Sequence, residues 1–252
     1  MKGIKAWAFN LLQRLFRSRG MELVAAGTKE RLAEQLQLPP ITGAGRLLAL
    51  QDVDLVLDVG AAVGMYGRSL RGGGYEGRIC SFEPLSRQFE RLRQESAADP
   101  LWEIRNMALG PETGTTEINV AGNFDSSSLL PMGERHAQAA PASVYVGTET
   151  VEVGTIDSVW DEVVGGARRP FLKLDVQGFE LEALRGAERS LPRIHGIQAE
   201  LSLVPLYEGG PLWREVIEFL VDKGFHVAGI EPGYADPESG EMLQVDGLFI
   251  RD

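Results

Sequence analysis

The 252-residue sequence contains a single cysteine, three histidines and no long apolar run. One cysteine excludes a framework of disulfides within the chain, which suits the reducing cytoplasm, and the Cys/His spacing typical of zinc sites is also absent. Cys80 lies in a short apolar run and is predicted to be a small buried hydrophobic residue. Charges interrupt the apolar stretches well before the roughly 20 residues that a membrane-spanning helix needs.

Positive charge is also scarce, because the formal net charge is −11. A protein that binds nucleic acid needs a dense basic face, so the composition argues against a nucleic-acid partner. The charge is uneven: residues 1–20 hold five Lys or Arg and no acidic residue, and the remainder carries −16. A negatively charged cleft in that remainder would favour a cationic cofactor.

Residues 2–17 are predicted to form a basic amphipathic helix. One stripe is apolar and the opposite face is polar, and the stripe consists of Ile4, Trp7, Ala8, Leu11 and Leu15, widened by Leu12 and Phe16. Such a helix can lie on an anionic membrane, which would place the protein at the inner face of the cytoplasmic membrane. The alternative is a helix that folds onto the domain or onto a second subunit of a homo-oligomer.

The chain is predicted to have two parts. A second helix from Thr28 must stop before Pro39-Pro40, because proline cannot extend it, and a helical pattern at 44–50 leads into the first strand. Residues 1–50 are therefore interpreted as an N-terminal helical appendage and residues 51–252 as the catalytic fold.

Apolar strands and amphipathic helices alternate along the second part, which predicts an α/β fold with a parallel sheet. The last two apolar runs, 225–230 and 242–250, have no helix between them and are expected to pair as a hairpin. The sheet is thus predicted to be mostly parallel with an antiparallel last strand. An insertion at 115–153 breaks the alternation and is expected to form a lid or a wall of the substrate site.

Two carboxylates follow neighbouring predicted strands and indicate a nucleoside site. Asp58 begins the turn that contains Gly60 and Gly64, and Glu83 ends the next apolar run, where it could accept hydrogen bonds from ribose hydroxyls. The turn has neither the Gly-x-Gly-x-x-Gly of dinucleotide sites nor the Gly-Lys-Ser/Thr of phosphate-binding loops. A ligand with an ammonium and a sulfonium group, S-adenosylmethionine, is therefore favoured over a plain structural turn and over NAD.

Five short motifs in order resemble those of the FkbM-family S-adenosylmethionine-dependent methyltransferases. They are Asp58–Gly64, Phe82–Pro84, Asn106–Gly110, Ser126–Leu129 and Lys173–Glu180. The resemblance implies a class I, Rossmann-like methyltransferase fold and transfer of a methyl group to a hydroxyl of a sugar, glycan, glycolipid or related natural product. The cofactor-binding residues expected from these motifs are Asp58, Gly60, Ala61, Gly64, Tyr66, Glu83, Pro84, Asn106, Ala108 and Asp175.

The sequence departs from the family pattern at two positions: Ala62 stands where the family usually has Asn, and Gln177 where it usually has Glu. These departures favour the alternative of a catalytically silent cofactor-binding or scaffold protein in a biosynthetic complex. They also weaken any metal site that would use position 177.

Methyl transfer to oxygen needs a base, and three residues are candidates: Asp175, His136 and Glu200. Asp175 and Glu200 follow apolar runs, so they should lie at the carboxyl edge of the sheet with Asp58 and Glu83. His136 lies in the insertion, where a solvated side chain is the alternative. Asp175 could instead only position the cofactor. Binding of a divalent cation by Asp175 and Glu200 is a further alternative, for which the sequence shows no third ligand.

The acceptor is expected to contact two residues, Ser127 in the insertion and Tyr207 in the loop after Glu200. Tyr207 could stack on the apolar face of a sugar ring. Trp213 falls on the buried face of the next helix and is predicted to belong to the core.

Overall fold

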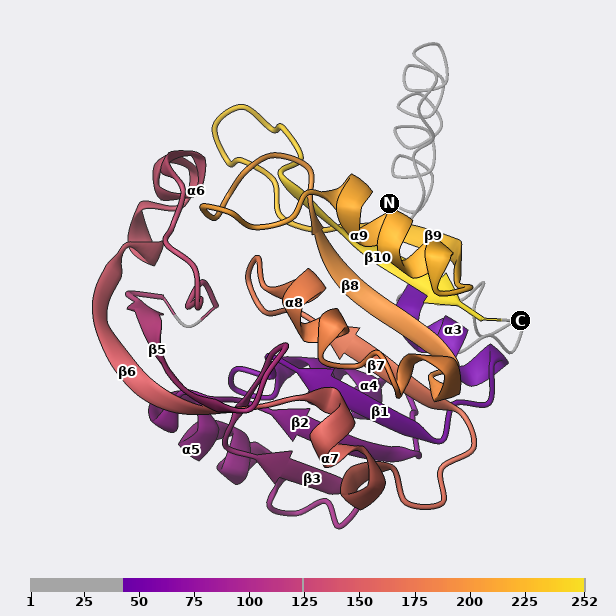
Figure 1. Cartoon of the computed structure of the whole chain (residues 1–252). Helices are drawn as coiled ribbons and strands as arrows, with labels where there is room; N and C mark the ends of the chain where they lie inside the picture. Colours follow the sequence, from indigo (N-terminus) through magenta and orange to yellow (C-terminus); the bar gives the residue numbers. More distant parts are fainter. Residues whose placement is uncertain (1–42, 124, 252) are drawn as a thin grey trace, which may run out of the picture. The chain divides into compact units, whose positions relative to one another are not determined.

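The computed structural model describes residues 43–123 and 125–251. A seven-stranded sheet with the order β3-β2-β1-β7-β8-β10-β9 forms its centre (Figure 1). The strands are β1 (Leu55–Val59), β2 (Arg78–Phe82), β3 (Trp102–Arg105), β7 (Pro170–Leu174), β8 (Gly196–Ser202), β9 (His226–Pro232) and β10 (Gln244–Ile250). The pairs from β3 to β8 are parallel, whereas β10 lies antiparallel between β8 and β9. This arrangement confirms the predicted class I methyltransferase sheet.

Helices cover both faces of the sheet. On one face, Leu48, Leu70 and Leu92 pack with Val56 and Phe171. Their helices are α3 (Gly43–Leu50), α4 (Met65–Gly72) and α5 (Ser86–Ser96). The core of the other face is contributed by the sheet, by the 3-10 turn η2 (Leu191–Arg193) and by α7 (Ile156–Val164), α8 (Glu180–Arg185) and α9 (Trp213–Asp222). Trp213 packs against this core while remaining partly exposed.

The alternation of side chains along β1 decides where its one acidic residue goes. Leu55, Leu57 and Val59 belong to the core on the α7 side. Successive side chains of a strand point to opposite faces, so Asp58 points with Val56 toward α4. In β7, Lys173 stands in register with Asp58. The sheet therefore brings a buried acid and a buried base together next to the first turn.

The insertion forms a second sheet. β5 (Gly114–Ala121) and β6 (Tyr145–Gly154) pair antiparallel, and β4 (Ala108–Leu109) adds to β6 in parallel. The connection between β5 and β6 carries α6 (Glu134–Ala139) and the 3-10 turn η1 (Pro141–Ser143). Figure 1 shows β6 as a long curved strand beside the central sheet, with α6 near its far end.

Helix α3 joins the domain core. Leu48 is buried and packs with Val53 and Val56. The structure thus places residues 43–50 with the catalytic fold, whereas the sequence placed them in the appendage. The helices predicted at 2–17 and from Thr28 lie outside the described residues. Within the part that is described, no helix is both long and apolar enough to cross a membrane.

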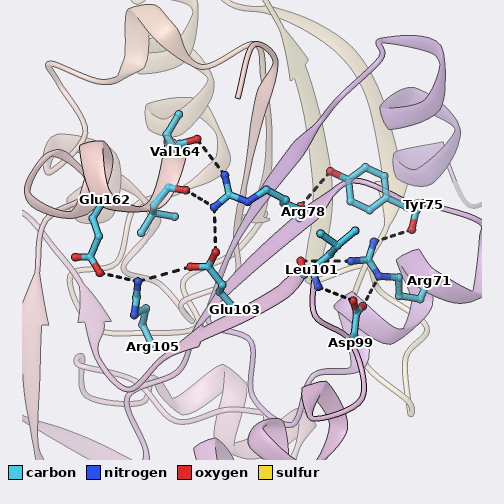
Figure 2. A network of polar contacts seen from close by, with 10 residues as sticks. Arg71, Tyr75, Arg78, Asp99, Leu101, Glu103, Arg105, Glu162 and Val164 are labelled. Carbon is cyan, nitrogen blue, oxygen red and sulfur yellow. Dashed lines mark hydrogen bonds and ion pairs between the residues drawn. The ribbon is translucent and has the colours of Figure 1, made fainter. Parts of the chain in front are cut away.

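An arginine ties the outer strands to the C-terminal end of α7. Arg78, at the start of β2, donates to the carbonyl oxygens of Val163 at 2.8 Å and Val164 at 3.2 Å, and pairs with Glu103 at 3.1 Å (Figure 2). The last carbonyls of a helix lack hydrogen-bond partners within the helix and carry partial negative charge. A guanidinium at this end donates hydrogen bonds to them and offsets their charge.

Substitution of Arg78 by alanine should lower the free energy of unfolding by about 1–3 kcal/mol, because two helix carbonyls and one carboxylate lose a charged donor. Urea unfolding monitored by circular dichroism measures the change. Arg93→Ala is the matched control, because it removes an exposed pair with Glu90 on α5, and it should leave the unfolding midpoint unchanged. Equal effects of the two substitutions would contradict the capping role.

Candidate active site

A cavity of about 350 Å³ opens at the carboxyl edge of the sheet. Its walls come from the turns after β1 and β2, the segment around β4, the turn after β7, the end of β8, and the insertion. Its size falls in the range of small-molecule sites. Six separate segments thus converge on one cavity, at the edge where open α/β sheets bind ligands.

The turn after β1 fits tightly against β7. Gly60 has φ 78°, and a Cβ atom there would lie 1.8 Å from the carbonyl oxygen of Asp175. The N–H groups of Gly60 and Ala61 both donate to the carbonyl of Phe82 at 3.0 Å. Any side chain at position 60 would therefore push the turn after β1 away from the turn after β7. Ala62 also has a positive φ of 47°, which costs a non-glycine residue about 1–2 kcal/mol.

Glu83 is buried and anchors that turn from the neighbouring strand. Its carboxylate accepts the N–H of Ala62 at 2.8 Å and the N–H of Leu85 at 2.9 Å. Asn106 donates to the carbonyls of Glu83 and Pro84, both at 2.9 Å. Burial raises the pKa of Glu83 to about 8, although the two backbone hydrogen bonds favour the ionised form.

A buried lysine lies beneath the cavity. The Nζ atom of Lys173 is 3.2 Å from Asp58 and 3.5 Å from Asp175, and it also donates to the carbonyl of Gly60 at 3.3 Å. Asp58 accepts a second hydrogen bond from the hydroxyl of Ser81 at 2.9 Å. Burial opposes the charge on Lys173, but Asp58 and Asp175 outweigh it and raise the pKa of the ammonium. Lys173 thus stays charged.

The turn after β7 places an amide between two carboxylates. The Nε2 atom of Gln177 donates to Asp175 at 2.8 Å and to Glu200 at 3.0 Å, while its Oε1 atom accepts the hydroxyl of Tyr207 at 2.6 Å. Burial, followed by the negative charges of Asp175 and Glu180, raises the pKa of Glu200 well above its usual value. Two carboxylates and the amide that links them therefore lie on one wall of the cavity.

Two predicted site residues lie behind this wall. His136 is buried and is not among the residues that line the cavity. Its Nε2 atom is 3.2 Å from the Ser126 hydroxyl, and its ring meets that of Tyr207 edge to face at 5.1 Å. Tyr207 is 2% exposed and does not reach the cavity either. The alternative of a solvated His136 is wrong, and the Tyr207 ring has no free face for a sugar.

The remaining predicted residues fall into two groups. Nine of them line the cavity: Gly60, Ala61, Tyr66, Glu83, Pro84, Ala108, Ser127, Asp175 and Glu200. Three others support it from outside: Asp58, Gly64 and Asn106. Sequence reasoning did not assign roles to Lys173 or Asp125, which also line the cavity. The alternation of side chains along β7 could have placed Lys173 on the same face of the sheet as Asp58, and this was the available sequence signal for Lys173. Among the described residues, no three His, Cys, Asp or Glu side chains are grouped to hold a metal ion.

The profile described as the methyltransferase FkbM domain matches residues 58–227, which is more than half of the chain. The chain belongs to the FkbM methyltransferase family. This FkbM-family chain is thus a methyltransferase, and the predicted cofactor, S-adenosylmethionine, is confirmed by that membership.

Similar proteins include the methyltransferase sdnD from Sordaria araneosa, 24% identical over 210 residues, covering 75% of this chain and 79% of that protein. The 2-O-methyltransferase NoeI from Sinorhizobium fredii is 23% identical over 172 residues, covering 66% and 70%. The crystal structure of methyltransferase FkbM from Methylobacillus flagellatus aligns with a TM-score of 0.49 and 16% identity. That alignment covers 78% of this chain and 44% of the Methylobacillus chain.

The Lys173→Met variant of this FkbM-family protein should lose about 3–5 kcal/mol of unfolding free energy, because it leaves the charge of Asp58 buried without an opposite charge. The double variant Lys173→Met, Asp58→Asn should recover much of that loss, since the stranded charge is gone. Urea unfolding of the two variants and the wild type measures both quantities. Equal stability of the single and double variants would contradict a charge-pair origin.

Proposed function

We infer that this methyltransferase transfers the methyl group of S-adenosylmethionine to a hydroxyl of a sugar, glycolipid or related natural product. The observation that carries the proposal is the layout of the one cavity. Glu83 and the Gly60 turn line one part of it, and the linked carboxylates Asp175 and Glu200 line another part, beside the insertion. This layout supports a proposal in which the first part would bind the nucleoside and the second would accept the proton.

The chain's residues fit the cofactor. S-adenosylmethionine supplies an activated methyl group on a positively charged sulfur and leaves as S-adenosylhomocysteine. Glu83 would accept hydrogen bonds from the ribose, and the Gly60 turn would let a ligand approach the backbone. The charged residues that line the cavity are four with carboxyl groups, Glu83, Asp125, Asp175 and Glu200, and one lysine, Lys173. The ammonium of Lys173 already faces Asp58 and Asp175. This excess of carboxyl groups over basic groups favours a cationic ligand over an anionic one.

The carboxylates Asp175 and Glu200 would handle the acceptor proton. When the acceptor oxygen displaces the sulfur from the methyl carbon, one of these carboxylates would take the hydroxyl proton and the sulfur would leave as a neutral thioether. Burial and the charge of Asp175 raise the pKa of Glu200, so its ionised form is a stronger base than an ordinary carboxylate. Asp175, held by Lys173 and Gln177, would align the acceptor.

The insertion would provide the acceptor wall through Ser127 and Asp125. The acidic lining disfavours an acceptor with a phosphate beside the reacting hydroxyl and favours a neutral, polyhydroxylated one. The similar protein NoeI is a 2-O-methyltransferase, which agrees with an oxygen acceptor. A membrane contact or a homo-oligomer through residues 2–17, and the cytoplasmic location, stay predictions.

The scaffold alternative retains one supporting observation. Ala62 adopts a left-handed backbone conformation that Asn tolerates better, so the departure at this position carries a cost in the cofactor turn. Calorimetry separates the two functions, because an enzyme should bind both S-adenosylmethionine and S-adenosylhomocysteine, whereas a scaffold need bind neither.

Turnover should fall by about 10²–10⁴ in Asp175→Asn, because the amide keeps the size but cannot take up or balance a proton. Mass spectrometry of a panel of sugars and glycolipids, with and without a chelator, should show a gain of one methyl group on the acceptor with the wild type and loss of that product with Asp175→Ala. Asp161→Asn, on the exposed surface of α7, is the control. A folded Asp175→Asn protein with unchanged turnover would sink the assigned role.

Cofactor binding should depend on the protonation of Glu83, whose pKa is raised to about 8. Neutral Glu83 is favoured by the fold, so its contribution to stability is present at low pH and is lost as pH rises through about 8. Ribose binding needs the ionised form instead, so the affinity for S-adenosylhomocysteine should rise up to about tenfold per pH unit below that value. It should level off above that value.

Glu83→Gln should weaken S-adenosylhomocysteine binding by about tenfold or more and flatten its pH dependence, because an amide oxygen cannot serve both backbone donors and the ribose. Titration calorimetry from pH 6 to 9 tests this. The control is Glu149→Gln in β6, a partly buried carboxylate outside the cavity lining that accepts the N–H of Ser86. A Glu83→Gln protein with the wild-type pH dependence would rule out the role of Glu83.

A further inference from the structure

Gln177 occupies an unusual backbone position for a residue with a side chain. Its φ is 55°, in the left-handed region, which costs a non-glycine residue about 1–2 kcal/mol. The next residue, Gly178, has φ 90°. The carboxylate of Glu180 accepts the N–H groups of Val176 at 3.0 Å and Gly178 at 3.2 Å, and so fixes the turn. The fold thus maintains a strained conformation at position 177.

The strain aims the side chain between two acids. Both N–H bonds of the Gln177 amide are used, one by Asp175 at 2.8 Å and one by Glu200 at 3.0 Å. A third contact sets which way the amide faces, because Tyr207 donates to its oxygen at 2.6 Å. Carboxylates accept hydrogen bonds, so only this orientation satisfies all three neighbours.

Tyr207 in turn is fixed by packing. A Cβ atom at position 178 would lie 2.9 Å from its ring, so glycine there lets the ring lie against the turn. The ring of His136 meets its edge. The insertion reaches the same turn, because the hydroxyl of Ser128 donates to the carbonyl of Gln177 at 2.7 Å. The amide is therefore held from both the sheet and the insertion.

We propose that Gln177 is a positioning residue that takes the place of a bridging cation, joining Asp175 and Glu200 through the two N–H bonds of one neutral amide. One oxygen of each carboxylate is bound in this way, and Lys173 faces the second oxygen of Asp175 at 3.5 Å. Among the described residues, none donates to the second oxygen of Glu200, which leaves it for the acceptor hydroxyl. The kinetic part of this inference rests on the proposed methyl transfer, and the part on cation binding does not.

The proposal can be tested by exchanging the amide nitrogen of Gln177 for oxygen. In Gln177→Glu, an oxygen replaces the donor nitrogen, and three carboxylates converge within contact of one another. Hard divalent cations prefer this set of oxygen ligands. We expect Gln177→Glu to bind Mn²⁺ at least about tenfold more tightly than the wild type, because the cation relieves the repulsion among the three carboxylates. Titration calorimetry with MnCl₂ measures it without any acceptor.

Gln138→Glu is the matched control. Gln138 lies on the exposed face of α6, where its amide donates to the carboxylate of Glu134 at 3.0 Å. The substitution adds the same charge beside one acid, away from the cavity, and should leave Mn²⁺ binding at the wild-type level. A folded Gln177→Glu protein that binds Mn²⁺ no more tightly than Gln138→Glu would overturn the inference.

Kinetics test the positioning role once an acceptor is in hand. Gln177→Leu should lower kcat by about ten- to a hundredfold through loss of the charged hydrogen bonds, with the KM for S-adenosylmethionine within about twofold of wild type. Added Mn²⁺ should raise the kcat of Gln177→Glu and leave that of Gln177→Leu unchanged. A kcat of Gln177→Leu equal to wild type, or a change confined to KM, would overturn the role.

Tyr207→Phe covers the case in which changes at position 177 prevent folding, as judged by the melting temperature. It removes only the hydroxyl that orients the amide and should lower kcat by about fivefold, the equivalent of one neutral hydrogen bond. An unchanged kcat in a folded Tyr207→Phe protein counts against the inference. Failure of the wild type to methylate any acceptor would instead count against the proposed function, and the Mn²⁺ result would stand separately.

Discussion

The site depends on one buried charge. Lys173 crosses from β7 to the first turn, where it contacts Asp58, Asp175 and the carbonyl of Gly60. Each of these groups would be costly to bury alone, and together they satisfy one another. The ammonium thereby fixes the relative position of the turns after β1 and β7, which both line the cavity. The ring centroid of Tyr66 lies 5.2 Å from the same ammonium, which makes a cation–π contact.

Much of this arrangement followed from simple rules applied to the sequence. Apolar runs that end on an acid predicted the carboxyl edge of the sheet, and Glu83, Asp175 and Glu200 all line the cavity found there. The antiparallel last strand followed from two runs without a helix between them. Both inferences use only the period of the strands and the rule that parallel strands end at a common edge.

The rest depended on contacts that no local pattern encodes. His136 was expected at the cavity because it lies in the insertion, and Tyr207 because it lies in the loop after Glu200, but each is buried against the other. The contact joins α6 to the loop after β8, about 70 residues apart in the sequence, and only the fold of the insertion reveals it. Asp58 was assigned to the ligand because the partner that neutralises it, Lys173, is 115 residues away and was not considered.

The position of β10 also bears on how the molecule acquires its shape. This strand is synthesised after β8 and β9, yet it is inserted between them and pairs with both. Until it arrives, the strand that carries Glu200 has an open edge that could pair with another chain. The wall that carries Glu200 is thus completed late during biogenesis, and in the nascent protein β1, β2 and β7 can pair while the edge of β8 is still vulnerable to aggregation.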